Sequence, residues 1–358
     1  MSEAKAETKP DQAAAAGGGA PAGGSNAVVS IGGAYEVDPK KPLAALASPA
    51  TKAFEARSKT DAKMQLFALV CQGPMPVRLG ILQAMVGLDN PHMIKLAHSG
   101  IVVWPPDQLQ RVVMLFQRPH GSRLTGADGR GEAWHHEQIS QKLVAPMLGV
   151  LGDLEARKIC HGAIRPDNIF APRGLAEGIV LGECLTQPVG YHQPVLYETL
   201  QRGMANPAGR GQGMISDDLY ALGVTMVTLL QGEPPLAGMS DEDILDRKLV
   251  QGSFYALVQK SRIPTNMLEP LRGLLNDDPA ERWTLEDLES WLGGRRLSPR
   301  PPEPPRKAVR PFEFSGYEAW EARGLSRVLS RDPVTAHRLY EQGEVEAWMR
   351  RALGEKNI

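Results

Sequence analysis

The sequence predicts an α+β fold, in which a small strand-rich part precedes a larger helical part. Short apolar runs bounded by glycine, proline and polar residues recur over residues 66–117, as expected of buried strands. Apolar residues at helical spacing dominate residues 135–292. With 42% hydrophobic and 23% charged residues, the composition is that of an ordinary globular protein with a sizeable core.

Several classes of protein are excluded by the bulk properties. A net charge of -1 gives no overall attraction to nucleic acid or to an anionic membrane, so neither partner is expected. Cys71, Cys160 and Cys184 form no pair at metal-ligand spacing, and their odd number argues against a secreted disulfide scaffold. The longest apolar runs fall far short of the roughly 20 residues that cross a bilayer. Because the charged N-terminus also lacks a signal peptide's apolar segment, we expect a cytoplasmic protein.

Changes in composition divide the chain into four segments. Residues 1–34 are rich in alanine and glycine, which bury too little area to offset the entropy of ordering, so a disordered leader is predicted. Residues 35–297 have the composition of a globular domain. Dense proline and arginine predict a semi-rigid linker at residues 298–311. Residues 312–358 predict a small helical module, with an expected core of Trp320, Leu325, Leu329, Leu339, Tyr340 and Trp348.

In the strand-rich part, three strands and one helix are predicted in order. Residues 66–72 form a short apolar run that ends at a Gly-Pro turn, which is typical of a buried strand. Residues 78–88 are apolar on several faces and predict a helix. Two further strands are predicted at residues 100–106 and 111–122, the second ending in turn residues.

The helical part begins with a long predicted helix at residues 135–158, followed by a short strand at residues 178–185. Residues 216–232 are strongly apolar between a Ser-Asp start and a glycine stop, which predicts a central buried helix. Three amphipathic helices should follow at residues 241–251, 266–275 and 284–294, the last opening with a Thr-x-x-Asp pattern close to a capping box.

Four motifs in this order resemble protein kinases, over roughly residues 66–292. "HGAIRPDNIF" resembles the catalytic loop HRDLKPxNI, and "DLYALGV" resembles the helix at the centre of the large lobe. "NDDPAERWTLEDL" resembles the closing DPxxRxT motif, while "PVLYETL" is a weak echo of the Ala-Pro-Glu segment. The catalytic-loop positions that match in register are His161, Pro166, Asn168 and Ile169.

The resemblance implies a two-lobed protein kinase-like fold, of bacterial type, with a β-rich N-lobe at about residues 35–117 and a helical C-lobe at about 118–297. It also implies scaffold roles for three residues. Glu198 would pair with Arg282, and Asp218 would hold the backbone of the catalytic loop.

The residues that perform phosphate transfer in the family are mostly replaced. The catalytic aspartate falls on Ala163 and its neighbouring arginine on Gly162, and a methyl group cannot accept a proton. The phosphate-binding lysine falls on Cys71, and residues 73–87 contain no acid that could hold such a lysine. His161, the first residue of the motif, is expected to pack and hydrogen-bond rather than act as a base.

The lid and the metal site are degenerate too. No glycine lies between Ala34 and Gln72, where a phosphate-covering loop would need residues without Cβ. The magnesium-binding aspartate aligns with Glu183, or with Gly182 if the register shifts by one. Asn168 is either a remaining metal ligand or, as we favour, a residue that caps the loop backbone.

The sequence therefore predicts a pseudokinase, that is, a kinase-fold signalling scaffold or allosteric regulator that binds protein partners, through residues 312–358. No cofactor is expected. A pocket formed by Cys71, Asn168 and Glu183 nevertheless leaves open the binding of ATP and magnesium, and ATP could then serve as a structural ligand without catalysis. The alternative is an atypical enzyme for phosphoryl or nucleotidyl transfer. It would bind metal through Glu183 and Asn168, with Arg78 or Lys95 in place of the lysine.

Overall fold

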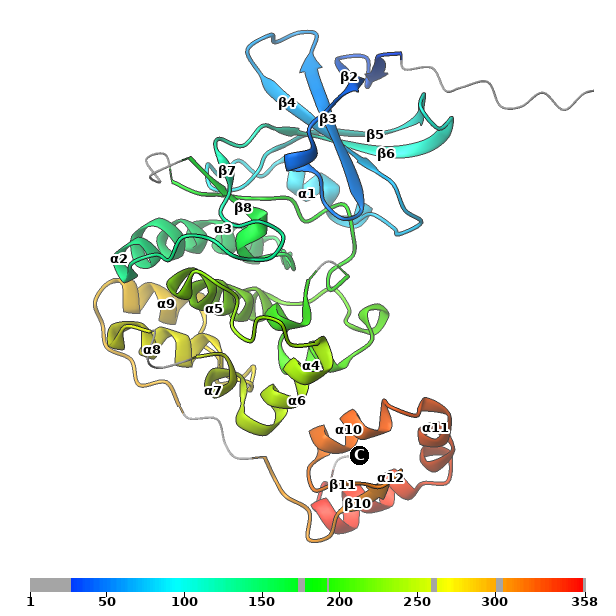
Figure 1. Cartoon of the computed structure of the whole chain (residues 1–358), viewed down its shortest axis with the longest axis vertical. Helices are drawn as coiled ribbons and strands as arrows, with labels where there is room; N and C mark the ends of the chain where they lie inside the picture. Colours follow the sequence, from blue (N-terminus) through cyan, green and yellow to red (C-terminus); the bar gives the residue numbers. More distant parts are fainter. Residues whose placement is uncertain (1–26, 173–177, 192, 259–262, 301–304, 357–358) are drawn as a thin grey trace, which may run out of the picture.

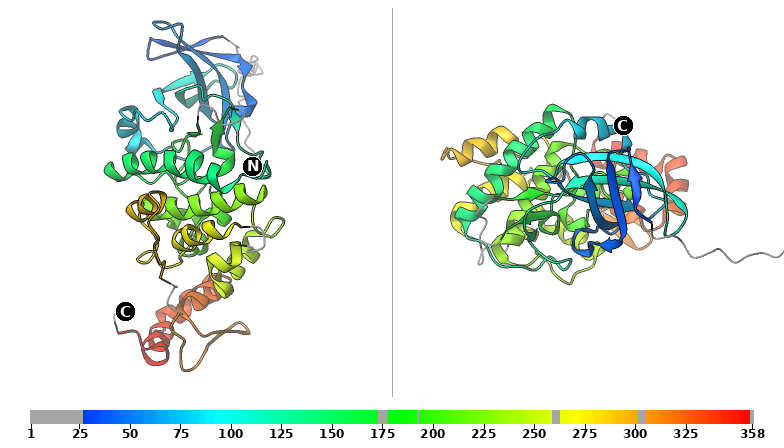
Figure 2. Two further views of the ribbon diagram at one scale, coloured as in Figure 1. Left: turned by 90° about the vertical axis from the view of Figure 1, so that its left-hand side faces the viewer. Right: turned by 90° about the horizontal axis from the view of Figure 1, so that it is seen from above.

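The computed structural model describes residues 27–172, 178–191, 193–258, 263–300 and 305–356. Three bodies follow one another along the long axis of the molecule: a sheet-based N-lobe, a helical C-lobe and a small C-terminal module (Figures 1 and 2). Within the described residues, no helix is both long enough and apolar enough to span a membrane.

The N-lobe is a six-stranded antiparallel sheet in the order β1-β2-β3-β4-β6-β5. Alternate residues of β4 enter two different cores, because successive side chains of a strand point to opposite faces. Phe67 and Leu69 join the core shared with the C-lobe, whereas Ala68 and Val70 join a second core inside the N-lobe. The elements are β1 (Val29–Ile31), β2 (Tyr35–Pro42), β3 (Thr51–Ser58), β4 (Gln65–Cys71), α1 (Leu82–Val86), β5 (Leu96–Trp104) and β6 (Leu109–Gln117).

The predicted disordered leader of residues 1–34 is too long, because strand β1 (Val29–Ile31) belongs to the sheet. Val29 and Ile31 are buried and pair with β2. The turn between the strands is made by Gly32 and Gly33, both with positive φ, so these glycines serve a tight turn. The alternation of apolar and polar residues in β1 covers only three residues, which is too short to stand out beside the low-complexity segment. Residues 1–26 lie outside the described residues.

The C-lobe is built around α5 (Ile215–Gln231), which is buried on nearly all sides. A three-stranded sheet of β7 (Ser122–Arg123), β8 (Ile169–Ala171) and β9 (Val180–Leu181) lies between the lobes. The predicted helix of residues 135–158 is α2 (His136–Gln138), a π-helical turn (Ile139–Val144) and α3 (Ala145–Ala156). The remaining helices are α4 (Leu200–Met204), α6 (Asp241–Gln251), α7 (Ser253–Leu257), α8 (Thr265–Leu274) and α9 (Leu285–Leu292).

The expected ion pair of Glu198 with Arg282 is corrected by the structure. Glu198 instead pairs with Arg202, one helical turn further on at 2.8 Å, and with Arg210 at 3.5 Å. The Arg282 guanidinium donates to the carbonyl oxygens of Asn276 and Ser216, at 2.9 and 3.0 Å. Two nearer arginines thus pair with the carboxylate. Backbone carbonyls accept from Nε and Nη1 of Arg282, whose buried Nη2 has no hydrogen-bond partner among the described residues.

Lys248 of α6 is fully buried beside this acid and binds the backbone around it. Its ammonium group donates to the carbonyl oxygens of Val195, Leu196 and Glu198, at 3.0, 2.8 and 3.0 Å. The three N–H donors of the ammonium group thus meet three acceptors, although burial lowers the pKa of Lys248 to about 7. The segment before α4 is fixed to α6 by these bonds.

The C-terminal module has its own hydrophobic core, to which Leu325 and Trp348 contribute as predicted. The helix-only prediction is incomplete, because the module begins with a hairpin of β10 (Phe312–Phe314) and β11 (Tyr317–Ala319). Its helices are α10 (Ala322–Leu329), α11 (Pro333–Glu341) and α12 (Glu344–Trp348), followed by a π-helical turn (Met349–Leu353).

Two further details of this module differ from the prediction. Trp320 and Tyr340 are 44% and 71% exposed, so neither belongs to the core. The module also starts before residue 312, since Ala308 is buried in its core and donates its N–H to the Trp320 carbonyl. The predicted linker is therefore shorter at its C-terminal end, and its residues 301–304 lie outside the described residues.

Replacement of Lys248 by methionine should strongly destabilise the C-lobe. The apolar side chain fills a similar volume but leaves buried carbonyl groups without a donor, at a cost of at least about 3 kcal/mol in the free energy of unfolding. Urea unfolding measures this loss. The exposed Lys142 provides the matched control, because Lys142→Met should change stability by less than about 0.5 kcal/mol. Equal stability of the two variants would contradict the assigned role.

Candidate functional site

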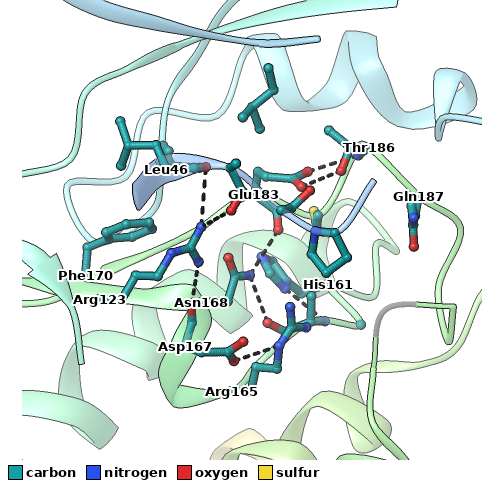
Figure 3. A pocket seen from close by; sticks show the side chains of 18 of the residues that line it. Leu46, Arg123, His161, Arg165, Asp167, Asn168, Phe170, Glu183, Thr186 and Gln187 are labelled. Carbon is teal, nitrogen blue, oxygen red and sulfur yellow. Dashed lines mark hydrogen bonds and ion pairs between the residues drawn. The ribbon is translucent and has the colours of Figure 1, made fainter. Parts of the chain in front are cut away.

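A cavity of about 180 Å³ lies between the lobes, at the place where the catalytic-loop motif meets the sheet (Figure 3). Its apolar wall is formed by Phe67, Leu69, Ile94 and Phe170. Polar side chains enter from β7, from the loop motif and from the segment after β9. They are Arg123, His161, Arg165, Asp167, Asn168, Glu183, Thr186 and Gln187.

The backbone of the loop is held by Asp218, in the first turn of α5. Its carboxylate accepts the N–H groups of His161 and Gly162, at 2.6 and 2.8 Å. Burial raises the pKa of Asp218 to about 6, and the two N–H donors oppose that rise by stabilising the carboxylate. The loop therefore has a fixed shape at its first two residues.

His161 is a buried packing residue in a defined tautomer. Its Nδ1 accepts the N–H of Ala163 at 3.2 Å, so the ring proton lies on Nε2 and is donated to the Gly182 carbonyl at 3.1 Å. Burial, reinforced by Arg78 and Arg165, lowers the pKa of His161 to about 3. With both ring nitrogens engaged and no charge at neutral pH, His161 is not placed to act as a general base.

The next two residues cannot replace the missing chemistry. Gly162 has a φ of +71°, in the left-handed region, and a Cβ there would lie 2.6 Å from Cγ1 of Val189. An arginine at this position would be strained and would clash. Ala163 lines the cavity with a methyl group, where the family has its proton acceptor.

Asn168 binds the backbone on both sides of the cavity. Its Nδ2 donates to the carbonyl oxygens of Ala163 and Glu183, at 2.9 and 3.0 Å. Both N–H groups of the amide are thus used inside the chain. Its Oδ1 faces Gly182, since a Cβ on that glycine would lie 2.1 Å from it. The side chain ties the loop to the end of β9.

Glu183 caps the turn that follows it and does not extend toward Asn168. Its carboxylate accepts the N–H groups of Leu185 and Thr186, at 2.7 and 3.0 Å, and the Thr186 hydroxyl at 2.5 Å. Between the two possible registers, Gly182 is the residue whose side-chain direction faces Asn168, and it carries no ligand atom. Among the described residues, no group of three or more His, Cys, Asp or Glu side chains is arranged to hold a metal ion.

Cys71, which was expected in the pocket, and Cys184 differ in position. Cys184 lines the cavity, whereas Cys71, at the end of β4, is buried but is not among the lining residues, which corrects the expectation. Burial raises the pKa of both thiols to about 12. Both are therefore neutral at pH 7 and behave as small apolar residues.

Neither basic residue suggested as a substitute for the lysine reaches the cavity. Arg78 donates to the carbonyl oxygens of Cys160, His161 and Cys184, at 2.8, 3.0 and 3.0 Å, and fixes the start of α1 to the C-lobe. Lys95 pairs with Asp89 at 2.8 Å on the surface. This part of the atypical-enzyme alternative is therefore wrong.

Two arginines in the cavity were missed by the sequence reasoning. Arg165 pairs with Asp167 at 2.7 Å, within the loop motif itself. Arg123 of β7 donates to the Ala45 and Ala47 carbonyl oxygens, at 3.1 and 2.9 Å, and also to the Asp167 carbonyl. Backbone carbonyls occur at every residue, so such partners leave no trace in a sequence.

The contacts of Arg123 close the loop between β2 and β3 over the cavity. This loop, residues 43–50, contains a 3-10 turn (Ala44–Leu46) and contributes Leu46, Ala47, Ser48 and Pro49 to the lining. In a sheet of this kind it occupies the place of the phosphate-covering lid. It carries side chains where backbone N–H groups would have to approach phosphates, and Arg123 bonds it to the C-lobe (Figure 3).

Comparisons with known proteins agree with the fold. No protein-family model matches the chain. Calcium-dependent protein kinase 22 of Oryza sativa subsp. japonica is 24% identical over 220 residues, which cover 58% of this chain and 37% of the rice protein. Human calcium/calmodulin-dependent protein kinase type 1B is 26% identical over 175 residues, covering 44% of this chain and 48% of that kinase. The chain thus spans less than half the length of these relatives.

Among solved structures, a crystal structure of Rad53 residues 1–466 in complex with AMP-PNP superposes with a TM-score of 0.54 at 14% identity. The match covers 71% of this chain and 63% of the Rad53 chain. The structural match shows that the fold is kinase-like, with a β-rich N-lobe and a helical C-lobe. The sequence matches show that the chain is homologous to protein kinases.

Replacement of Arg123 by methionine should release the loop of residues 43–50. The variant keeps an apolar side chain of similar length but loses the guanidinium group, which lies over the Phe170 ring. The lost hydrogen bonds from this charged donor are worth about 1.5–3 kcal/mol. Hydrogen exchange of the amides of residues 44–47 should therefore become roughly 10- to 150-fold faster. The exposed Arg118 supplies the control, and unchanged exchange in Arg123→Met relative to Arg118→Met would contradict the role of Arg123.

The buried, neutral state of His161 should make the protein sensitive to acid. Between pH 6.5 and about 3 the unfolded chain binds a proton at this residue and the folded chain does not. The free energy of unfolding should therefore decrease as the pH is lowered through this window. The contribution of His161 to this decrease is up to about 1.4 kcal/mol per pH unit. Unfolding of wild type and His161→Gln is measured at several pH values. The variant should lack the pH-dependent contribution of His161, so the difference in stability between wild type and variant should become smaller in acid. A constant gap from pH 8 to 4.5 would disprove the assignment.

Proposed function

We propose that this chain is a pseudokinase, a kinase-fold protein that transfers no phosphate and acts as a scaffold or regulator through protein contacts. One observation carries the proposal. The polar side chains left at the centre of the cavity are bonded to the chain itself: His161 to Gly182, Asn168 to Ala163, and Glu183 to its own turn. At the position of the proton acceptor stands the methyl group of Ala163.

The size and closure of the cavity support the same proposal. Pockets that enclose a drug-sized ligand usually measure about 300–1,000 Å³, more than this cavity offers. Entry of a nucleotide would also require the loop of residues 43–50 to leave Arg123. Binding energy would be spent on breaking these bonds before any phosphate contact formed.

Several buried features of the C-lobe maintain the fold. Asp218, α5 and the buried Lys248 stabilise the C-lobe without taking part in transfer. A stable C-lobe beside a closed cavity favours a function on the surface, with a protein partner. We propose that this function is exercised in the cytoplasm. The C-terminal module is the candidate for partner binding, since it has its own core and lies outside the two lobes.

Titration of ATP, with and without magnesium, into wild type and Glu183→Ala tests the proposal. We expect no heat of binding and no rise in melting temperature with nucleotide. Glu183→Ala should be less stable by about 1–2 kcal/mol with or without ATP, because the turn loses its cap.

Transfer of radiolabelled phosphate, to the chain or to a generic protein substrate, is measured in parallel. Magnesium-dependent binding that disappears in Glu183→Ala would mean that a metal site forms with ligand present, and phosphate transfer would overturn the proposal outright. Binding of ATP without transfer would instead support a structural role for the nucleotide, next to the apolar wall of Phe67, Leu69 and Ile94.

A further inference from the structure

Three arginines lie on the side of the C-terminal module that contacts the C-lobe, two of them against α6. Arg323, Arg327 and Arg331 follow one another at intervals of four residues, which places them on one helical face along α10 and its C-terminal end. Arg327 pairs with Asp246 at 2.8 Å, and Arg331 pairs with the same carboxylate at 3.3 Å. We call these three residues the arginine face. Figures 1 and 2 show α10 beside α6.

The contact with α6 leaves the arginine face incompletely satisfied. Nη2 of Arg327 is buried and has no hydrogen-bond partner among the described residues, and its nearest ion-pair partner, Glu242, is 3.9 Å away. Arg323 reaches the Asp277 carbonyl only at 3.5 Å. A buried guanidinium N–H without an acceptor is costly, so a second carboxylate beside Arg327 would improve the contact.

The contacts that join the module to the C-lobe here are charged. Leu325 and Trp348 belong to the module's own core, which is separate from the core shared by the lobes. Asp246 is 42% exposed at its side chain, so water and salt reach the ion pairs. Exposed ion pairs contribute little each and are screened by salt, and contacts of this kind allow domains to separate.

We propose that the arginine face is the partner-binding surface of the module, that its partner is an acidic helix, and that α6 masks it within the chain. The proposal deepens the proposed function and rests on its partner-binding part. Helix α6, which contacts the arginine face in this structure, indicates the chemistry of the partner. It presents the carboxylates of Glu242 and Asp246, one helical turn apart. A helix with carboxylates on both sides of Arg327 would satisfy the guanidinium better than α6 does.

The first measurement is small-angle scattering of the full chain at about 0.1 M and about 1 M salt, where screening lengths are roughly 10 and 3 Å. Wild type should expand at high salt, and Asp246→Lys should be expanded at both concentrations. Asp246→Lys combined with Arg327→Glu restores opposite charges and should be compact again at low salt. A chain of unchanged dimensions in all cases would refute masking by α6.

The second measurement is fluorescence anisotropy with a labelled peptide that copies residues 240–251, at low salt. The peptide should bind Asp246→Lys at least about tenfold more tightly than wild type, which corresponds to about 1.4 kcal/mol. Its matched control carries Gln and Asn at the positions of Glu242 and Asp246 and should not bind. Adding Arg327→Gln and Arg331→Gln to Asp246→Lys should abolish binding of the acidic peptide.

Expansion of Asp246→Lys without peptide binding would overturn the assignment of an acidic helix as partner. It would still agree with masking of the arginine face by α6. An oligonucleotide with the same net charge as the peptide is measured as well. Tighter binding of the oligonucleotide than of the peptide would indicate nucleic acid as the partner and would reject the proposal. None of these results depends on phosphate transfer. Failure here is therefore distinguishable from failure of the pseudokinase assignment, which the ATP titration decides.

Discussion

The buried carboxylate of Asp218 is the constraint on which the rest of the site depends. It lies in the first turn of α5, where the helix dipole favours negative charge, and it receives two N–H groups of the loop. Once His161 and Gly162 are fixed, the imidazole can bridge Ala163 and Gly182, and Asn168 can join the loop to β9. The loop owes its shape to a residue 57 positions after His161, so it keeps that shape with a methyl group at position 163.

Cations that bind backbone carbonyls connect the parts of this molecule. Arg78 joins the N-lobe to the loop, Arg123 joins the covering loop to the C-lobe, and Lys248 joins α6 to the segment before α4. A buried cation must find acceptors, and carbonyl oxygens supply them where neither a phosphate nor a carboxylate is at hand. In an active kinase, positive charge at the cavity serves the nucleotide. Here the positive charge of Arg123 holds the cavity closed.

The sequence was sufficient for features set by local patterns. The central helix was predicted from its apolar length and its glycine stop, and Thr284 and Asp287 form the capping box that their spacing suggests. Features that depend on a choice among tertiary partners were not predictable. Glu198 pairs with the arginines that lie nearest to it in the folded chain, which the sequence does not specify. The acceptors of Arg123 are backbone carbonyls, which every residue has and which no residue type therefore marks. The exposure of Trp320 likewise depends on the β-hairpin before it, which the helical pattern of the module concealed.

The features on which the proposed loss of catalysis rests are distributed over several residues, so a single substitution should not supply phosphate transfer. An aspartate at position 163 would supply a proton acceptor. Both arginines among the described residues that line the cavity are already engaged, Arg165 with Asp167 and Arg123 with backbone carbonyls. An arginine at position 162 would conflict with the left-handed backbone and with Val189. Because these local contacts support a closed cavity, we expect the proposed function to lie on the outer surfaces of the fold. The charged junction between α6 and α10 is such a surface, because its contacts can exchange for others at little cost.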